Sequence, residues 1–141
     1  MCIRDSANAK LTYKKYEELF GGARWKALAS KGAQVQRLLW ASTSVKNKKY
    51  RDVMYVEELI GADTVDTIPP ATFDAFRDHG KLRKSLTENV DDAAKVMGNL
   101  EKAGISMREV TEKLVVDGVK LFADAFKQLL DATGKSAGVK A

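Results

Sequence analysis

A short polar turn between an apolar segment and a predicted helix carries the residues best suited to bind an anion. Residues 42–49 read Ser-Thr-Ser-Val-Lys-Asn-Lys-Lys. Ser42, Thr43 and Ser44 offer hydroxyl donors, the backbone offers amide donors and the lysines at 46, 48 and 49 offer cations. The oxygens of a phosphate monoester accept from all of these. No glycine-rich phosphate motif is present, so a solvated polar turn is the simpler alternative. The turn therefore predicts a phosphate-binding site without selecting among these residues.

Other residues that can do chemistry form weaker patterns. His79 is the only histidine, and it ends a predicted helix where a cation favours the dipole, so we expect a structural or exposed role without a visible partner. One histidine and one cysteine, Cys2, are too few for a zinc site, and no nucleophile-elbow motif accompanies His79. Asp63 and Asp66 have an odd separation, so they face opposite sides of a strand and do not pair as acid and base. These patterns predict no metal site, no Ser-His-Asp triad and no acid–base pair.

Length and composition restrict the class of protein. The chain has 141 residues, enough for one domain, and is 45% hydrophobic and 30% charged, which excludes collagen-like, disordered and disulfide-scaffold classes. A single cysteine cannot form an internal disulfide, so we expect a reducing, cytoplasmic setting. No apolar run approaches the roughly 18 residues of a spanning helix, so we expect no membrane association.

Positive charge is concentrated in the first third of the chain. Residues 1–50 carry 11 Lys and Arg against 3 Asp and Glu, whereas residues 51–141 carry 13 against 16. Such a region can meet a phosphate, a nucleic acid or an acidic surface. The densest cations are Lys46, Lys48, Lys49 and Arg51. Tyr50 is their one aromatic neighbour, so we predict no nucleic-acid partner and keep a basic helical module that binds RNA or an acidic partner as the alternative function.

Glycines divide the sequence into helical segments. Apolar-periodic stretches end before Gly21, Gly32, Gly61, Gly80, Gly104 and Gly134. Glycine can close a helix in the left-handed conformation, so we predict helices at about 7–20, 23–31, 50–60, 70–79, 90–103 and 107–132. Ser106 and Glu109 predict a capping box at the start of the last helix.

Two other segments predict strands. Residues 35–42 are short and largely apolar, and residues 63–68 are β-branched and stopped by two prolines. One helix lies between them, so we predict a βαβ unit with parallel strands. Parallel strands normally belong to larger sheets covered by helices, so two strands among about six helices indicate a piece of a larger α/β fold.

The two ends of the chain do not read as parts of that fold. Residues 1–6, Met-Cys-Ile-Arg-Asp-Ser, resemble the translation of a DNA tag used in preparing sequencing libraries, and we expect a non-native leader there. Residues 134–141 are small and polar, and we expect a frayed tail. The folded part is then expected at residues 7–133.

Four runs of residues resemble transaldolase. They read Gln-Arg-Leu-Leu-Trp-Ala-Ser-Thr-Ser-Val-Lys-Asn at 36–47, Tyr-Val-Glu-Glu-Leu-Ile-Gly at 55–61, Asp-Thr-Val-Asp-Thr-Ile-Pro-Pro at 63–70 and Asp-His-Gly at 78–80. The run from Trp40 to Asn47 is the most specific, because it joins a strand to a polar loop through an unusual string. The resemblance covers the chain from about Ala7 onward and is closest to the longer bacterial and cyanobacterial transaldolases.

This resemblance implies a fold and a reaction. The fold is the C-terminal part of a TIM (β/α)8 barrel: two parallel strands with their helices and a helix-rich C-terminal extension. The parent enzyme would transfer a dihydroxyacetone unit between sugar phosphates in the pentose phosphate pathway, through a lysine Schiff base and without a cofactor. From sedoheptulose 7-phosphate and glyceraldehyde 3-phosphate it would make erythrose 4-phosphate and fructose 6-phosphate. The resemblance leaves the oligomeric state open, and another phosphate-handling aldolase barrel is a further alternative.

The resemblance also implies roles for single residues. Ser42 matches a serine that helps to hold the substrate phosphate in this family. Many single-domain members read Gly-Ala-Ser-Phe-Arg-Asn at this point. A two-residue insertion in this chain would place Lys46 at the position of their arginine. Without that insertion, Ser44 occupies the position. A lysine would bind phosphate as a point charge and lose the bidentate fork of arginine.

The lysine that forms the Schiff base is expected outside this chain. Such a lysine must be partly neutral near pH 7, as burial or a neighbouring cation can make it, and it would lie on a barrel strand. Neither predicted strand contains lysine. We therefore expect the chain to be inactive alone, and poorly soluble because missing strands expose apolar surface.

Overall fold

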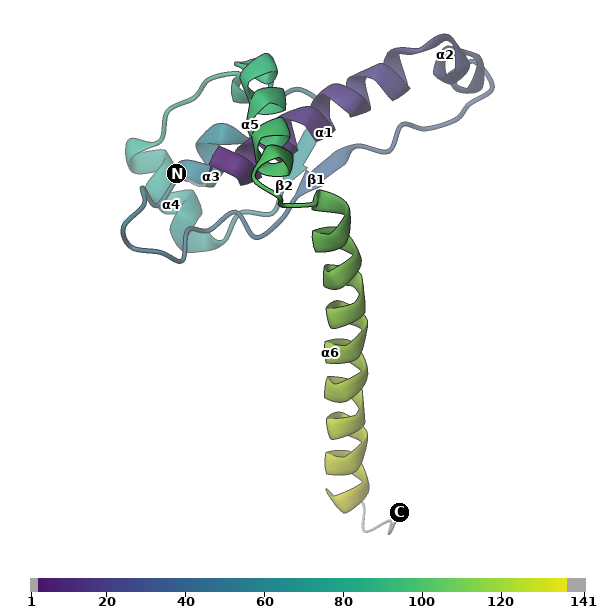
Figure 1. Cartoon of the computed structure of the whole chain (residues 1–141), viewed down its shortest axis with the longest axis vertical. Helices are drawn as coiled ribbons and strands as arrows, with labels where there is room; N and C mark the ends of the chain where they lie inside the picture. The colour runs from purple at the N-terminus through teal and green to yellow at the C-terminus, as the bar shows by residue number, and fades with distance from the viewer. Residues whose placement is uncertain (1–2, 137–141) are drawn as a thin grey trace. The chain divides into compact units, whose positions relative to one another are not determined.

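The computed structural model describes residues 3–136 in two compact units, which divide between Asn99 and Leu100. Unit 1 contains α1 (Ile3–Gly21), α2 (Ala23–Ala29), β1 (Leu38–Trp40), α3 (Met54–Glu58), β2 (Thr64–Asp66), α4 (Pro70–His79), the 3-10 helix η1 (Ser85–Thr87) and most of α5 (Val90–Lys102). Unit 2 contains the end of α5 and α6 (Met107–Ser136). Figure 1 shows this order of elements.

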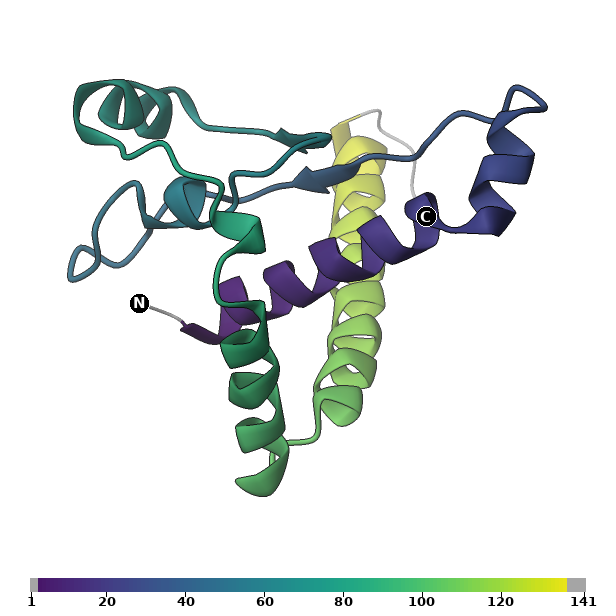
Figure 2. The same cartoon turned by 90° about the horizontal axis from the view of Figure 1, so that it is seen from above.

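The predicted parallel βαβ unit is confirmed. Leu38 pairs with Thr64, Leu39 with Val65 and Trp40 with Asp66 in a parallel sheet, and α3 lies between the strands along the chain. Figure 2 shows the two strands side by side. Each strand has three residues, fewer than predicted at 35–42 and 63–68, because each has only one neighbour and residues 35–37 are exposed.

The buried core of unit 1 forms where α1, α3 and η1 meet. Leu86 of η1 is completely buried, and its backbone N–H donates to the Ile60 carbonyl at 3.2 Å. A Cβ added at Gly61 would lie 2.6 Å from Leu86 Cδ1, so glycine permits this close approach. Lys10 of α1 is also buried, and its Nζ lies 3.5 Å from Glu58 Oε2 and 3.1 Å from the Glu88 carbonyl oxygen. The sequence did not predict η1.

The helix ends follow the glycine pattern only in part. Gly32 and Gly104 have positive φ, of 88° and 80°, as expected of glycines that close helices. Helix α4 ends at His79 as predicted, but the expectation of a left-handed glycine after it is wrong, because Gly80 is extended at φ −69°. There a Cβ would lie 2.3 Å from Phe76 Cδ2, so the glycine serves a close contact and not a left-handed turn. It is also wrong for Gly134, which lies inside α6.

The predicted ends of the chain differ from the structure in their boundaries. Helix α1 begins at Ile3 and includes the last residues of the expected leader, while Met1 and Cys2 lie outside the described residues. Helix α6 continues to Ser136, so the start of the expected tail is helical, and residues 137–141 lie outside the described residues. Whether residues 1–6 are non-native stays a prediction.

Unit 2 contributes a long helix without a core of its own. The Ser106 hydroxyl oxygen accepts from the Glu109 backbone N–H at 3.3 Å, which confirms the serine half of the predicted capping box. Helix α6 carries apolar residues at steps of three and four, but their side chains are between 53% and 83% exposed: Val115, Val119, Phe122, Phe126, Leu129 and Leu130. In the described part of the chain, every buried residue therefore belongs to unit 1. None of the helices among the described residues combines the length and apolar character needed to cross a membrane.

Candidate phosphate-binding site

The three predicted site residues line one cavity beyond the carboxyl end of β1. This cavity has a volume of about 490 Å³, and its lining includes Ser42, Ser44 and Lys46. The rest of its wall comes from the same turn, from α3 and the residue after it, and from α1: Ala41, Thr43, Val45, Asn47, Tyr50, Tyr55, Leu59, Asp5, Ser6 and Ala9. Among the described residues, no carboxylate forms an ion pair with Lys46, so its ammonium is available to an anion.

The first end of the turn is held on the sheet. Thr43 is 2% exposed, and its hydroxyl donates to Asp66 Oδ1 at 3.0 Å. The Thr67 backbone N–H donates to the Trp40 carbonyl at 3.0 Å, which ties the end of β1 to the residue after β2. Burial raises the pKa of the Asp66 carboxyl, and the hydrogen bond from Thr43 opposes that rise. Asp63 lies outside β2 at φ 55°, so the structure does not pair it with Asp66 as acid and base.

Ser42 has an unusual backbone conformation. Its φ is 59°, in the left-handed region that costs a non-glycine residue roughly 1 kcal/mol or more. The residue is exposed, so packing of its side chain does not explain the strain. The conformation instead turns the chain sharply at the end of β1, where the buried Thr43 follows. The two serines on either side of Thr43 both line the cavity.

The second end of the turn is held by Arg51. Its guanidinium donates from Nε and Nη2 to the Glu57 carboxylate, at 3.1 Å and 2.9 Å, and from Nη2 to the His79 carbonyl at 2.6 Å. Glu57 Oε1 also accepts from the Lys81 backbone N–H at 2.9 Å. The hydrogen bond from Arg51 lowers the pKa of Glu57 below its usual value. The turn is therefore fastened to α3 and to the residues that end α4.

His79 has two partners that the sequence did not reveal. Its Nε2 lies 2.8 Å from Asp52 Oδ1, and its Nδ1 lies 3.0 Å from Asp78 Oδ2. Hydrogen bonding to Asp52, then to Asp78, raises the pKa of His79 above its ordinary value. The sequence showed no partner for His79, and the fold supplies two. Asp78 adjoins His79 in the sequence and was a usable signal, but Asp52 is 27 residues away and only the fold brings it near.

One carboxylate in the cavity wall opposes anion binding. Asp5 lies in the lining, and its Oδ2 accepts from the Tyr55 hydroxyl at 2.9 Å. Asp5 belongs to the segment that we expect to be a non-native leader. An experiment on the site is therefore best made without residues 1–6.

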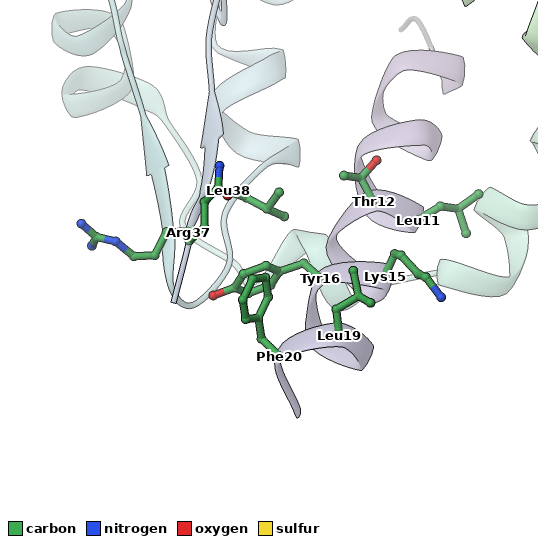
Figure 3. Close-up of a pocket in the computed structure, with 9 residues that line it drawn as sticks. Leu11, Thr12, Lys15, Tyr16, Leu19, Phe20, Arg37 and Leu38 are labelled. Atoms are coloured by element: carbon green, nitrogen blue, oxygen red, sulfur yellow. The ribbon is translucent and has the colours of Figure 1, made fainter. Parts of the chain in front are cut away.

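A second cavity lies at the other end of β1 (Figure 3). It also has a volume of about 490 Å³ and is lined by α1 and by the residues that lead into β1: Leu11, Thr12, Lys15, Tyr16, Leu19, Phe20, Gln36, Arg37 and Leu38. Most of these side chains are apolar or aromatic. In α/β folds with parallel strands, ligands bind beyond the carboxyl ends of the strands, so we assign the candidate site to the first cavity.

The parallel βαβ unit, with its polar turn beyond the carboxyl end of a strand, places the protein in the α/β class. Comparison with known proteins identifies the family. The family model described as Transaldolase/Fructose-6-phosphate aldolase matches residues 4–133. The chain belongs to this family, which confirms the resemblance seen in the sequence.

Curated relatives agree with this assignment. The chain is 46% identical over 128 residues to a transaldolase of Trichodesmium erythraeum, covering 89% of the chain and 34% of the relative. It is 46% identical over 133 residues to a transaldolase of Parafrankia sp., covering 94% of the chain and 36% of the relative. It is 48% identical over 129 residues to a transaldolase of Mycobacterium ulcerans, covering 90% of the chain and 35% of the relative. The chain thus spans about a third of the length of the curated relatives that it matches.

Proposed function

We propose that residues 7–133 form the C-terminal part of a transaldolase barrel, in which Ser42, Ser44 and Lys46 bind the phosphate group of a sugar phosphate. The observation that carries the proposal is the shared cavity. The three side chains that the resemblance implies for phosphate binding line one cavity of about 490 Å³ beyond the carboxyl end of β1. Loops at that face of α/β barrels commonly hold substrate phosphate groups.

The reaction proposed for the complete enzyme is transfer of a dihydroxyacetone unit between sugar phosphates through a lysine Schiff base. Neither β1 nor β2 contains lysine. Lys10 is buried, but its ammonium is engaged by Glu58 and by the Glu88 carbonyl oxygen. These observations support placing the reacting lysine in the two thirds of the relatives' length that this chain does not span.

We expect no covalent adduct when the 141-residue chain is incubated with fructose 6-phosphate and sodium borohydride. Borohydride reduces a Schiff base to a stable amine, and intact-mass spectrometry detects the added sugar. The matched control is a chimera in which residues 7–133 replace the matching segment of the Trichodesmium erythraeum transaldolase. The chimera should trap the sugar, because it supplies the missing strands. An adduct on the 141-residue chain would contradict the assignment of the lysine to another segment.

Replacing Lys46 with alanine in the chimera should raise the KM for fructose 6-phosphate about three- to fivefold and leave kcat nearly unchanged. The effect is modest because Lys46 is exposed and water screens its charge. Lys46→Arg should retain most of the affinity, since it keeps the cation. Steady-state kinetics provides the measurement.

Lys48 is the matched control for Lys46. It lies in the same turn, but it is not among the residues that line the cavity. Lys48→Ala should therefore change the KM by less than about twofold. Equal effects at Lys46 and Lys48 would show that only the general positive charge of the turn matters, which would contradict a specific contact with the phosphate.

A further inference from the structure

The turn that carries the proposed phosphate site ends in a group of charged side chains that phosphate binding does not use. We call it the His79 cluster: Arg51, Asp52, Glu57, Asp78 and His79. Arg51 and Asp52 lie between the turn and α3, Glu57 lies in α3, and Asp78 and His79 lie in the last turn of α4. None of these five residues lines the phosphate cavity. No group of three or more potential ligand side chains in the described residues is arranged to hold a metal ion, so the cluster needs another explanation.

The His79 cluster connects α4 to the turn through two separate contacts. Asp52 Oδ1 lies 2.8 Å from His79 Nε2, and Arg51 Nη2 donates to the His79 carbonyl at 2.6 Å. The next residue, Val53, is completely buried, so the chain is also held on that side. Towards the cavity, the Tyr50 N–H donates to the Asn47 carbonyl at 3.0 Å. A short chain of contacts therefore leads from His79 to the residue that adjoins Lys46.

The two contacts of the His79 ring form together in only one protonation state. Both ring nitrogens lie within hydrogen-bond distance of a carboxylate oxygen. An ionised carboxylate only accepts, and neutral imidazole has a single N–H, so only the imidazolium can donate to both partners at once. A neutral His79 must give up one of the two hydrogen bonds.

We propose that His79 is a positioning residue for the phosphate site: its imidazolium, held between Asp52 and Asp78, fixes the end of the turn and so keeps Lys46 at the cavity. This inference rests on the proposed phosphate-binding function of the turn. It adds that phosphate affinity depends on the charge of a side chain outside the cavity.

The direction of the pH dependence follows from the groups that face His79. Asp52 approaches from the turn and Asp78 from α4, and both raise the pKa of His79, while the nearby Arg51 guanidinium opposes them. Glu57 is occupied by Arg51 and by the Lys81 N–H. Because folding raises this pKa, the imidazolium contacts contribute their full stability when the pH is below the pKa of His79 in the unfolded chain. Their contribution is lost as the pH rises through the pKa of His79 in the folded chain. Anion affinity should therefore fall as pH increases.

Sulfate is the suitable probe, because it keeps its charge between about pH 6 and pH 8.5, whereas a phosphate monoester titrates near pH 6. The experiment titrates sulfate into the chimera, ¹⁵N-labelled only in residues 7–133 by segmental ligation, and follows the amide resonances of residues 42–47. We expect the dissociation constant to rise about two- to threefold from about pH 6 to about pH 8.5. His79→Gln should bind at about pH 6 as weakly as the unchanged chimera does at about pH 8.5, without a pH dependence. His79 is the only histidine of residues 7–133, and a pH dependence that came from a histidine elsewhere in the chimera would persist in His79→Gln.

Two further variants separate positioning from a general loss of structure. Asp52→Asn removes the charge that connects His79 to the turn and should reproduce His79→Gln. Asp78→Asn removes the other carboxylate, which contacts the same ring but belongs to α4. This variant should keep tight sulfate binding at about pH 6, and its affinity should fall at a lower pH than that of the unchanged protein. Retention of the original pH profile by His79→Gln would overturn the inference.

Ser42→Ala distinguishes this inference from the proposed function on which it rests. Loss of sulfate binding in Ser42→Ala, combined with unchanged binding and pH dependence in His79→Gln, would overturn only the role of His79. Absence of sulfate-dependent shifts in residues 42–47 of the unchanged chimera would overturn the phosphate site and the positioning role together.

Discussion

Replacing Ser42 with alanine in the chimera should raise the KM for fructose 6-phosphate by about tenfold or more. A hydrogen bond to a charged group contributes about 1.5–3 kcal/mol, and the lower figure corresponds to roughly a tenfold change in affinity. The effect should exceed that of Lys46→Ala, because a short hydroxyl side chain loses little conformational entropy when it binds. Steady-state kinetics measures it, with unphosphorylated fructose as the comparison substrate. Equal losses for both sugars would show that Ser42 does not contact the phosphate.

Ser42→Gly is the matched control, because the backbone of Ser42 has φ 59°. Glycine adopts this conformation without strain, whereas alanine meets the same steric cost as serine. If the hydroxyl binds phosphate, Ser42→Gly and Ser42→Ala should raise the KM equally. If Ser42→Gly restored the affinity lost in Ser42→Ala, the conformation of the turn and not the hydroxyl would be the source of binding.

Replacing Leu86 with alanine should lower the free energy of unfolding by about 3 kcal/mol, within the range of about 2–5 kcal/mol for buried leucines. Leu86 is completely buried and packs against Gly61, so the shortened side chain leaves a cavity in the contact between η1 and the end of α3. Urea unfolding of the chimera, followed by fluorescence, measures the change in midpoint at constant slope.

Leu82→Ala is the control for this loss, because Leu82 is 82% exposed and lies only four residues earlier. Its effect should stay within about 0.5 kcal/mol, as for other surface substitutions. A loss at Leu82 as large as that at Leu86 would show that α4 and η1 are packed differently in the chimera. That result would also count against the positioning role that we propose for His79, since His79 ends α4 shortly before Leu82.

Local patterns predicted most of the secondary structure. Pro70 marks the start of α4, Ser106 caps α6, and the β-branched run before the prolines contains β2, since each of these signals acts within a few residues. The same patterns overestimated the length of both strands and predicted a helix end before Gly134, which lies inside α6. A strand extends only as far as a neighbouring strand pairs with it. The type of a single residue does not indicate which residues lie beside it in the fold.

By itself, the sequence determined the βαβ order, the family and the turn with Ser42, Ser44 and Lys46, because residue type and short spacing suffice for these. Only the tertiary structure decided that the three side chains share a cavity and that Asp52 meets His79 across 27 residues. It also decided that Gly80 serves a close contact with Phe76. The physical reason is the same in each case: such contacts depend on how separate elements pack, and packing distances are set by all the side chains between them.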